Sequence, residues 1–247
     1  MTVRGHVLTM STDANDAYGL AITGLNKHAH AAALGPIRFI LESLAWLSWL
    51  LEDPDDDVRR ARAYRLAMND VESFRRVGNT FNRVTAEGAD AKEMNSRLAA
   101  ASDRMKGELL DLADEDGVVI PPRPGSVSKL AEQYLSAHGG YMTYAMLSSA
   151  GAHPGPIHGF LFYGDPETGL ADYAFKGMFD RRAYWTAVAI RLYLDVCDLT
   201  APVLDWPDWE TTAAATRREL QTLADEAETR CERPWRRAFA RLSEVAD

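Results

Sequence analysis

Residues 36–52 of this 247-residue chain are PIRFILESLAWLSWLLE, the most apolar stretch of the sequence. Isoleucine or leucine stands at positions 37, 40, 41, 44, 47 and 51, which is the spacing of a helix, and these side chains cover more than one helix face. A helix that is apolar on most sides is normally central in a bundle. The stretch therefore predicts the core helix of an all-α protein.

The segments that flank this stretch also have helical patterns. Pro36 either opens a new helix at its first turn or lies at a kink in one continuous helix. Before it, residues 13–33 are expected to be helical, with Ser11 to Asp13 as caps. After the Asp53-Pro54-Asp55 break, we expect an amphipathic helix over 58–84, which Gly78-Asn79 would interrupt. A strongly polar helix over 89–114 should follow and either lie on the outside or pair with another chain.

The second half of the chain continues the helical pattern around two loops. Residues 116–125, DGVVIPPRPG, are expected to be a loop because proline interrupts helices. A second, Gly/Pro-rich loop should cover 151–177, with a small hairpin around 160–163. Further helices are expected over 126–137, 141–150, 180–199, 208–230 and 234–245. Together these segments predict a single multi-helix bundle of about seven to nine helices that spans residues 1–247, with its core at 13–200 and a C-terminal helical extension at 201–247.

The composition bounds the classes of function. The net charge is −9 with a pI near 5.2, so we expect no DNA partner, since DNA-binding proteins usually carry a basic surface. Two cysteines, at 197 and 231, are too few for a disulfide framework, and the first ten residues lack the apolar run of a secretory signal. The apolar run over 39–51, interrupted by Glu42, is expected to be too short and too polar to span a membrane. The prediction is a cytoplasmic protein.

Arg38 and Glu42 are the most suggestive charged residues because they lie on the most apolar helix. They are four residues apart and share a helix face, and Trp46 extends the same stripe. Burying a charge is costly unless it is paired, so the two should be partners. They would form either a structural ion pair between helices or one wall of an internal polar pocket that binds a small anionic molecule.

A second polar cluster precedes and enters the Gly/Pro-rich loop. Tyr144 and Ser148 are also four residues apart, and His153 and His158 follow them. A phenol, a hydroxyl and an imidazole near a helix end could transfer protons, with His153 as general acid or base and Ser148 and Tyr144 beside it. They could equally form a hydrogen-bond network that closes the helix.

The sequence offers no strong metal site, and none is expected. His28 and His30 point in different directions on a helix and cannot chelate one ion together. The acidic run over 52–56 has the composition of a magnesium-binding box of helical terpene synthases, and Asn69-Asp70 has part of the second box. Val77 stands where the second box needs its last acid, and the two boxes are close together. The acidic run is therefore interpreted as a helix cap.

The pattern Arg38-x-x-x-Glu42-x-x-x-Trp46-x-x-Trp49-Leu50-Leu51, followed by the Arg-rich segment at 59–65, resembles a group of uncharacterised actinobacterial all-helical proteins that are distantly similar to HEPN bundles. Their second signature is similar to Tyr144-x-x-Leu147-Ser148-x-x-x-x-His153. The resemblance covers residues 20–160 and implies that Arg38, Glu42, Ser148 and His153 converge in one polar site. It implies no activity, and the Arg-to-His spacing of HEPN ribonucleases is missing here.

Three classes of function remain open. The protein could bind a small anionic molecule in an internal pocket formed by Arg38, Glu42, Trp46 and His158. It could be an enzyme that uses His153 as its acid or base. It could also be an HEPN-like interaction or defence protein that acts through oligomerisation or RNA. The polar helix over 89–114 and the tryptophans at 206, 209 and 235 favour a homodimer.

Overall fold

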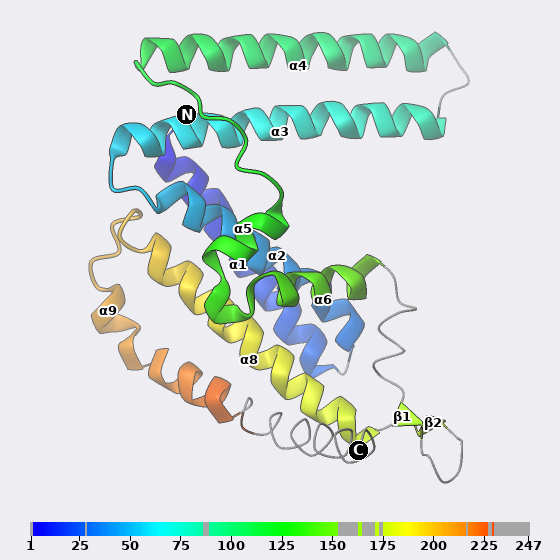
Figure 1. Cartoon of the computed structure of the whole chain (residues 1–247), viewed down its shortest axis with the longest axis vertical. Helices are drawn as coiled ribbons and strands as arrows, with labels where there is room; N and C mark the ends of the chain where they lie inside the picture. The colour runs from blue at the N-terminus through cyan, green and yellow to red at the C-terminus, as the bar shows by residue number, and fades with distance from the viewer. Residues whose placement is uncertain are drawn as a thin grey trace, which may run out of the picture. The chain divides into compact units, whose positions relative to one another are not determined.

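The computed structural model describes residues 2–27, 29–85, 89–152, 163–164, 171–172, 175–215, 217–226 and 229. Almost all of them are helical (Figure 1). The extended segments among them are β1 (Tyr163–Gly164) and β2 (Ala171–Asp172), which pair antiparallel, with Tyr163 opposite Asp172. The prediction of an all-α, multi-helix protein is confirmed.

The most apolar helix is α2 (His30–Leu51), as residues 36–52 predicted. Ile37, Ile40, Leu41 and Leu47 are fully buried, because apolar residues surround most of this helix. Pro36 lies inside this helix, so no helix begins there, but the helix is not continuous with the preceding one either. The first helix, α1 (Val3–Asn26), ends before the predicted residue 33, and the break falls between Asn26 and His30. Proline removes one backbone hydrogen bond of a helix, and here α2 continues past that loss.

By length and composition, Ala32–Leu51 could cross a membrane, which corrects the expectation drawn from residues 39–51 alone. The stretch is longer than expected because the helix begins before Pro36. Its mean hydropathy is 1.3, and 61% of the apolar window is buried inside the protein. The core helix of a soluble protein has the same properties, so the prediction that no segment enters a membrane stays a prediction.

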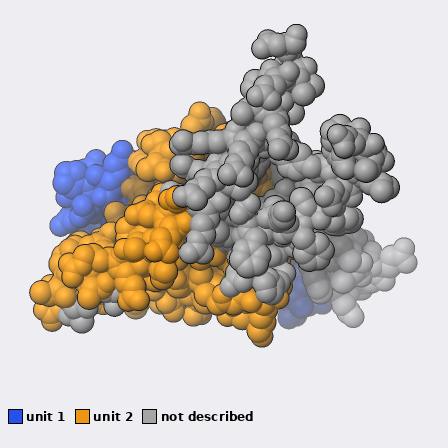
Figure 2. Space-filling model, turned by 90° about the horizontal axis from the view of Figure 1, so that it is seen from below, with its two compact units in different colours: residues 1–6, 50–125 blue, residues 7–49, 126–247 orange. Residues whose placement is uncertain are grey.

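The structure divides into two compact units, coloured separately in Figure 2. Unit 1 comprises residues 1–6 and 50–125, and unit 2 comprises residues 7–49 and 126–247. The sequence had suggested one domain with a core at 13–200. The division differs because α3 (Asp56–Thr85) and α4 (Ala89–Glu115) pack mainly on each other.

Unit 1 is built on the antiparallel hairpin of α3 and α4 (Figure 1). Ala61 and Tyr64 of α3 pack against Ala113 of α4 and against Val118 in the segment that follows. The Tyr64 hydroxyl donates a hydrogen bond of 2.6 Å to a carboxylate oxygen of Asp116, which closes the base of the hairpin. Residues 118–126 are not helical, as the prolines predicted, and α3 runs through Gly78-Asn79 without a break.

Unit 2 holds α2 together with helices from both ends of the sequence. The hydroxyl of Tyr193 on α8 (Phe175–Thr200) donates a hydrogen bond of 2.8 Å to Asn15 of α1 (Val3–Asn26). The rings of Tyr18 and Tyr193 stack with centroids 4.3 Å apart. Contacts between residues so distant in sequence hold α1 against α8. Unit 2 includes α1 (Val3–Asn26) from Val7 onward and α2 up to Trp49. Its other helical elements are α5 (Val127–Tyr134), η1 (Ser136–His138), α6 (Gly140–Ala152), α8 (Phe175–Thr200) and α9 (Trp209–Thr212).

The start of the first helix was predicted ten residues too late. Ser11 and Thr12 do not cap a helix, because their hydroxyls donate to the Leu8 carbonyl at 3.0 and 2.8 Å from inside α1. Serine and threonine can bond back to the preceding turn in this way, and sequence does not distinguish that arrangement from a cap.

Three predictions in the second half of the chain had other outcomes. The helix predicted over 208–230 is interrupted, because α9 ends at Thr212 and Ala213 is a bend. The hairpin predicted around 160–163 is reduced to β1 and β2, which begin at Tyr163. Residues 160–162 and the helix predicted over 234–245 lie outside the described residues.

Candidate functional site

Arg38 and Glu42 form the predicted ion pair on α2. The Arg38 Nε donates a hydrogen bond of 2.7 Å to Glu42 Oε1, because side chains four residues apart lie on one helix face. The two side chains are 34% and 27% exposed, so water screens their attraction. An ion pair of this exposure stabilises the fold by no more than about 1 kcal/mol.

Tyr144 of α6 joins this pair although it is 106 positions away in sequence. The Arg38 Nη2 donates to the Tyr144 hydroxyl at 3.4 Å, and the guanidinium carbon lies 5.4 Å from the centre of the Tyr144 ring. A guanidinium over an aromatic face is attracted by the electrons of the ring. Arg38, Glu42 and Tyr144 therefore form a three-residue cluster between α2 and α6, which we call the Arg38 cluster.

The electrostatics of the cluster keep Arg38 charged. Partial burial alone would lower the pKa of the guanidinium, but the hydrogen bond and charge of Glu42, together with Tyr144, outweigh it and raise the pKa. Arginine has five N–H donors, and the described contacts use two of them. Three donors, including both on Nη1, have no partner among the described residues and can bind the oxygens of a ligand.

Ser148 lies one turn after Tyr144 on α6. Its hydroxyl is buried and has no hydrogen-bond partner among the described residues. An unpaired buried hydroxyl costs free energy, so such a group is a natural place for a ligand or a water to bind.

Of the other predicted site residues, Trp46 is described and the two histidines are not. Trp46 packs edge-on against Trp49 on the same helix, with ring centroids 5.8 Å apart, and no described contact joins it to Arg38. His153 and His158 lie outside the described residues. The predicted convergence of His153 and Ser148 with Arg38 therefore stays a prediction.

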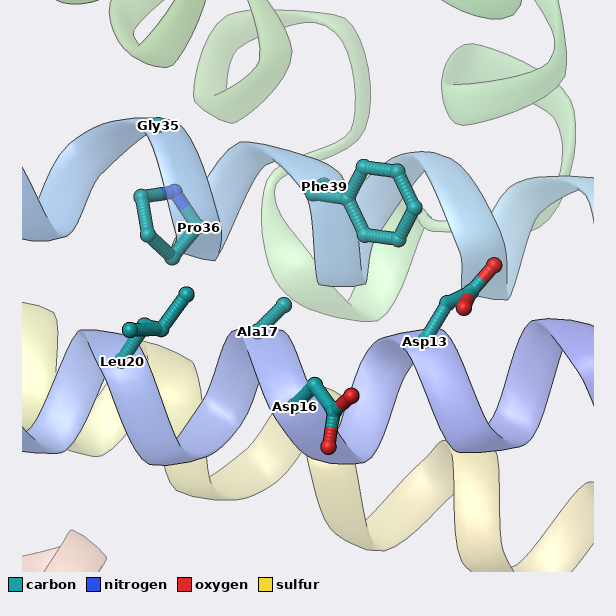
Figure 3. Close-up of a pocket in the computed structure, with 7 residues that line it drawn as sticks. All are labelled: Asp13, Asp16, Ala17, Leu20, Gly35, Pro36 and Phe39. Atoms are coloured by element: carbon teal, nitrogen blue, oxygen red, sulfur yellow. The ribbon is translucent and has the colours of Figure 1, made fainter.

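A groove that sequence reasoning missed lies between α1 and α2, with a volume of about 530 Å³ (Figure 3). Asp13, Asp16 and Leu20 line it from α1, and Pro36 and Phe39 line it from α2. Leu20 and Phe39 are exposed apolar side chains, and neither aspartate has an ion-pair partner among the described residues. The spacing of Asp13, Asp16 and Leu20 puts them on one helix face, which is the signal that could have indicated the groove. Its acidic, apolar lining suits a cation rather than an anion.

A histidine–carboxylate pair was also missed. His138 Nε2 lies 2.6 Å from a carboxylate oxygen of Asp195, and the imidazole side chain is 11% exposed. The two residues are 57 positions apart, and nothing in the local sequence connects them. The contact ties η1 to α8.

The acidic segment just before α3 caps that helix, which agrees with its interpretation as a helix cap rather than a metal-binding box. Carboxylate oxygens of Asp53 and Asp55 accept hydrogen bonds of 3.0 and 2.8 Å from the backbone N–H groups of Asp55 and Asp57. Asn69 is engaged by Arg65, whose Nη2 donates to its side-chain oxygen at 2.8 Å. Within the described ranges, no three of the histidine, cysteine and acidic side chains are grouped as metal ligands would be.

No match to this chain was found among protein-family models, curated proteins or solved structures. The resemblance to actinobacterial helical proteins therefore stays a prediction.

Proposed function

We propose that the protein binds a small molecule that carries a carboxylate, and that the carboxylate binds Arg38. The carrying observation is the contact of Arg38 with Tyr144, which holds the guanidinium where α2 meets α6, with three of its N–H donors lacking a partner in the part of the chain that the structure describes. A guanidinium held in one orientation offers two parallel N–H groups to a carboxylate, and this bidentate pairing is specific as well as favourable.

Glu42 determines how strong and how selective this binding is. Its carboxylate already occupies the Nε of Arg38 and places a negative charge close to the incoming anion. The cluster is therefore nearly neutral, and a simple anion binds weakly. A ligand that also carries a hydrogen-bond donor for Glu42 binds more tightly, since each charged group then has a partner. The buried Ser148 hydroxyl, one turn beyond Tyr144, supplies a further polar contact for such a ligand.

Benzoate and benzylammonium are matched probes for this proposal because they have similar size and opposite charge. Titration of the full chain by calorimetry or NMR should show benzoate binding that Arg38→Gln weakens by about tenfold or more, the scale of one lost charged hydrogen bond. Glu42→Gln should strengthen benzoate binding, since it removes the repelling charge while keeping an acceptor for Arg38.

The control removes an arginine that lies elsewhere. Arg75→Gln changes the net charge by the same amount, but Arg75 is an exposed residue of α3 that pairs with Asp103 at 3.0 Å. It should leave benzoate binding unchanged. Unchanged binding in Arg38→Gln would overturn the proposal. Binding of benzylammonium alone, lost in Asp13→Asn or Asp16→Asn, would also overturn it and assign ligand binding to the groove between α1 and α2.

A further inference from the structure

The helix α4 has two apolar stripes, and the hairpin of unit 1 uses one of them. The first stripe faces α3 and contains Ser102 and Ala113, both 2% exposed, and Leu109, which packs against the cluster around Tyr64. These residues recur at intervals of seven and four, the spacing of a helix seam.

The second stripe lies beside the first, and three of its large apolar side chains are exposed to solvent. It contains Met94, Leu98, Ala101, Met105 and Leu112, which are separated by four, three, four and seven positions, with Glu108 at the position between the last two. This is the heptad spacing of a coiled coil. Met94, Met105 and Leu112 are 54%, 47% and 43% exposed, which is unusual for large apolar side chains repeated along one line.

We propose that this second stripe of α4 pairs with the same stripe of a second copy of the chain, with the two α4 helices antiparallel. In this register Met94 faces Leu112 of the second copy, and the small Ala101 faces the long Met105. The same register puts Leu98 opposite Glu108 of the second copy, so the match of small to large side chains applies at the centre of the contact and not along its whole length. A two-fold axis relates the two copies, so the contact is self-complementary and the assembly stops at a dimer.

Most of the charges at the stripe favour the antiparallel direction, although Arg104 then lies near Arg104 of the second copy. Arg97, which pairs with Glu93 of the same helix at 2.5 Å, lies near the N-terminal end of the stripe. Glu108, at a position within the stripe, and Asp111, beside it, lie near the C-terminal end. An antiparallel pair puts the Glu108 and Asp111 carboxylates of one copy near Arg97 of the other. A parallel pair in register would put Glu108 against Glu108, and such a like-charge contact is destabilising.

Stripe residues run from Met94 to Leu112, a length of roughly 27 Å at 1.5 Å per residue. A contact of one helix pair is at the small end of specific interfaces, so we expect a weak dimer that forms as concentration rises. The proposal concerns unit 1 and does not depend on ligand binding by the Arg38 cluster in unit 2. Either proposal can fail without the other.

Leu112 and Leu110 allow a closely matched test. Both are exposed leucines of α4, at 43% and 48%, and they point about 200° apart around the helix. In sedimentation velocity runs on the full chain, from low to high micromolar concentration, Leu112→Glu should weaken the dimer by about tenfold or more because it buries an unpaired charge. Leu110→Glu should leave the dimer unchanged. A wild-type chain that stays monomeric, or equal effects of the two variants, would overturn the proposal.

The direction of pairing is tested by exchanging charges. Arg97→Glu and Glu108→Arg should each weaken the dimer, and the double variant should restore it, because opposite charges again meet across the antiparallel contact. Helical content measured by circular dichroism verifies that each variant is folded. If the double variant is as weak as the singles, the antiparallel arrangement is wrong.

Discussion

His6 is a buried imidazole in the first turns of α1. The side chain is 7% exposed, the Ala63 carbonyl accepts a hydrogen bond from it, and its Nε2 has no partner among the described residues. Burial lowers the pKa of His6, and this effect outweighs the opposing effects of Asp70 and the Ala63 carbonyl. The folded protein therefore holds a neutral imidazole at a pH where the unfolded chain begins to take up a proton.

This shift predicts a loss of stability in mild acid. As pH falls below the ordinary histidine pKa of 6.5, the unfolded chain binds a proton that folded His6 does not, so the free energy of unfolding decreases. The loss cannot exceed about 1.4 kcal/mol per pH unit for one group. Burial raises the pKa of Asp70, which has the opposite effect in the lower range where carboxylates titrate.

Urea unfolding of the wild type and of His6→Met at several pH values between about 7 and 5.5 isolates this residue, because the other histidines are common to both. The wild type should lose stability towards pH 5.5 more steeply than His6→Met does. Parallel pH profiles for the two proteins would show that His6 titrates alike in the folded and unfolded states.

The side-chain contact that the sequence predicted correctly joins two residues close together in the sequence. Arg38 and Glu42 pair because the helix places them together whatever the rest of the chain does. The contact of Arg38 with Tyr144 depends on how α6 packs on α2, and no local pattern determines that. The same limit explains why the His138–Asp195 pair was missed.

At the scale of elements, α2 has one exposed edge on an otherwise buried surface. Leu47 is fully buried, whereas Phe39 is 44% exposed at the rim of the groove with α1. A buried large side chain stabilises through transfer from water and through packing, and its removal leaves a cavity. Removal of an exposed side chain loses little of this free energy and leaves no closed cavity.

Leu47→Ala should therefore cost about 2–5 kcal/mol of unfolding free energy. Phe39→Ala should cost less than about 1 kcal/mol although it removes more atoms, since surface substitutions usually have small effects. The measurement is urea unfolding of both variants followed by tryptophan fluorescence. A loss in Phe39→Ala as large as that in Leu47→Ala would mean that Phe39 is covered in solution.

Helix boundaries were predictable where they are marked by residues that interrupt a helix in almost every context. Asp53-Pro54-Asp55 separates α2 from α3, as these residues predicted. Boundaries were not predictable where a residue can either cap a helix or lie inside one, as Ser11 and Thr12 do inside α1. Pro36 is also such a residue, because tertiary packing decides whether a helix continues through a proline.

At the scale of the whole molecule, the helical pattern revealed the fold class but not the division into units. Each amphipathic helix must bury one face, and the sequence does not say against which partner. α4 was expected to lie on the outside or to pair with another chain, and its packing on α3 forms a separate small core at Ala61, Tyr64, Ala113 and Val118. Which helices share a core is a property of contacts far apart in sequence.

The division into units can be tested by spectroscopy because of where the tryptophans lie. All six, at 46, 49, 185, 206, 209 and 235, belong to unit 2. Tryptophan fluorescence therefore reports unfolding of unit 2 alone, whereas circular dichroism at 222 nm reports the helices of both units. If the units unfold separately, a variant that weakens one of them should separate the two signals.

Tyr64→Ala removes a side chain that is 2% exposed in the core of unit 1, and it should cost about 3–5 kcal/mol there. Its circular dichroism should begin to change at lower urea, while the fluorescence midpoint stays that of the wild type. Leu192→Ala, at a fully buried position of α8 in unit 2, should give the opposite result, with the fluorescence midpoint moving to lower urea. Equal displacement of both signals in both variants would contradict separate unfolding and show one cooperative core.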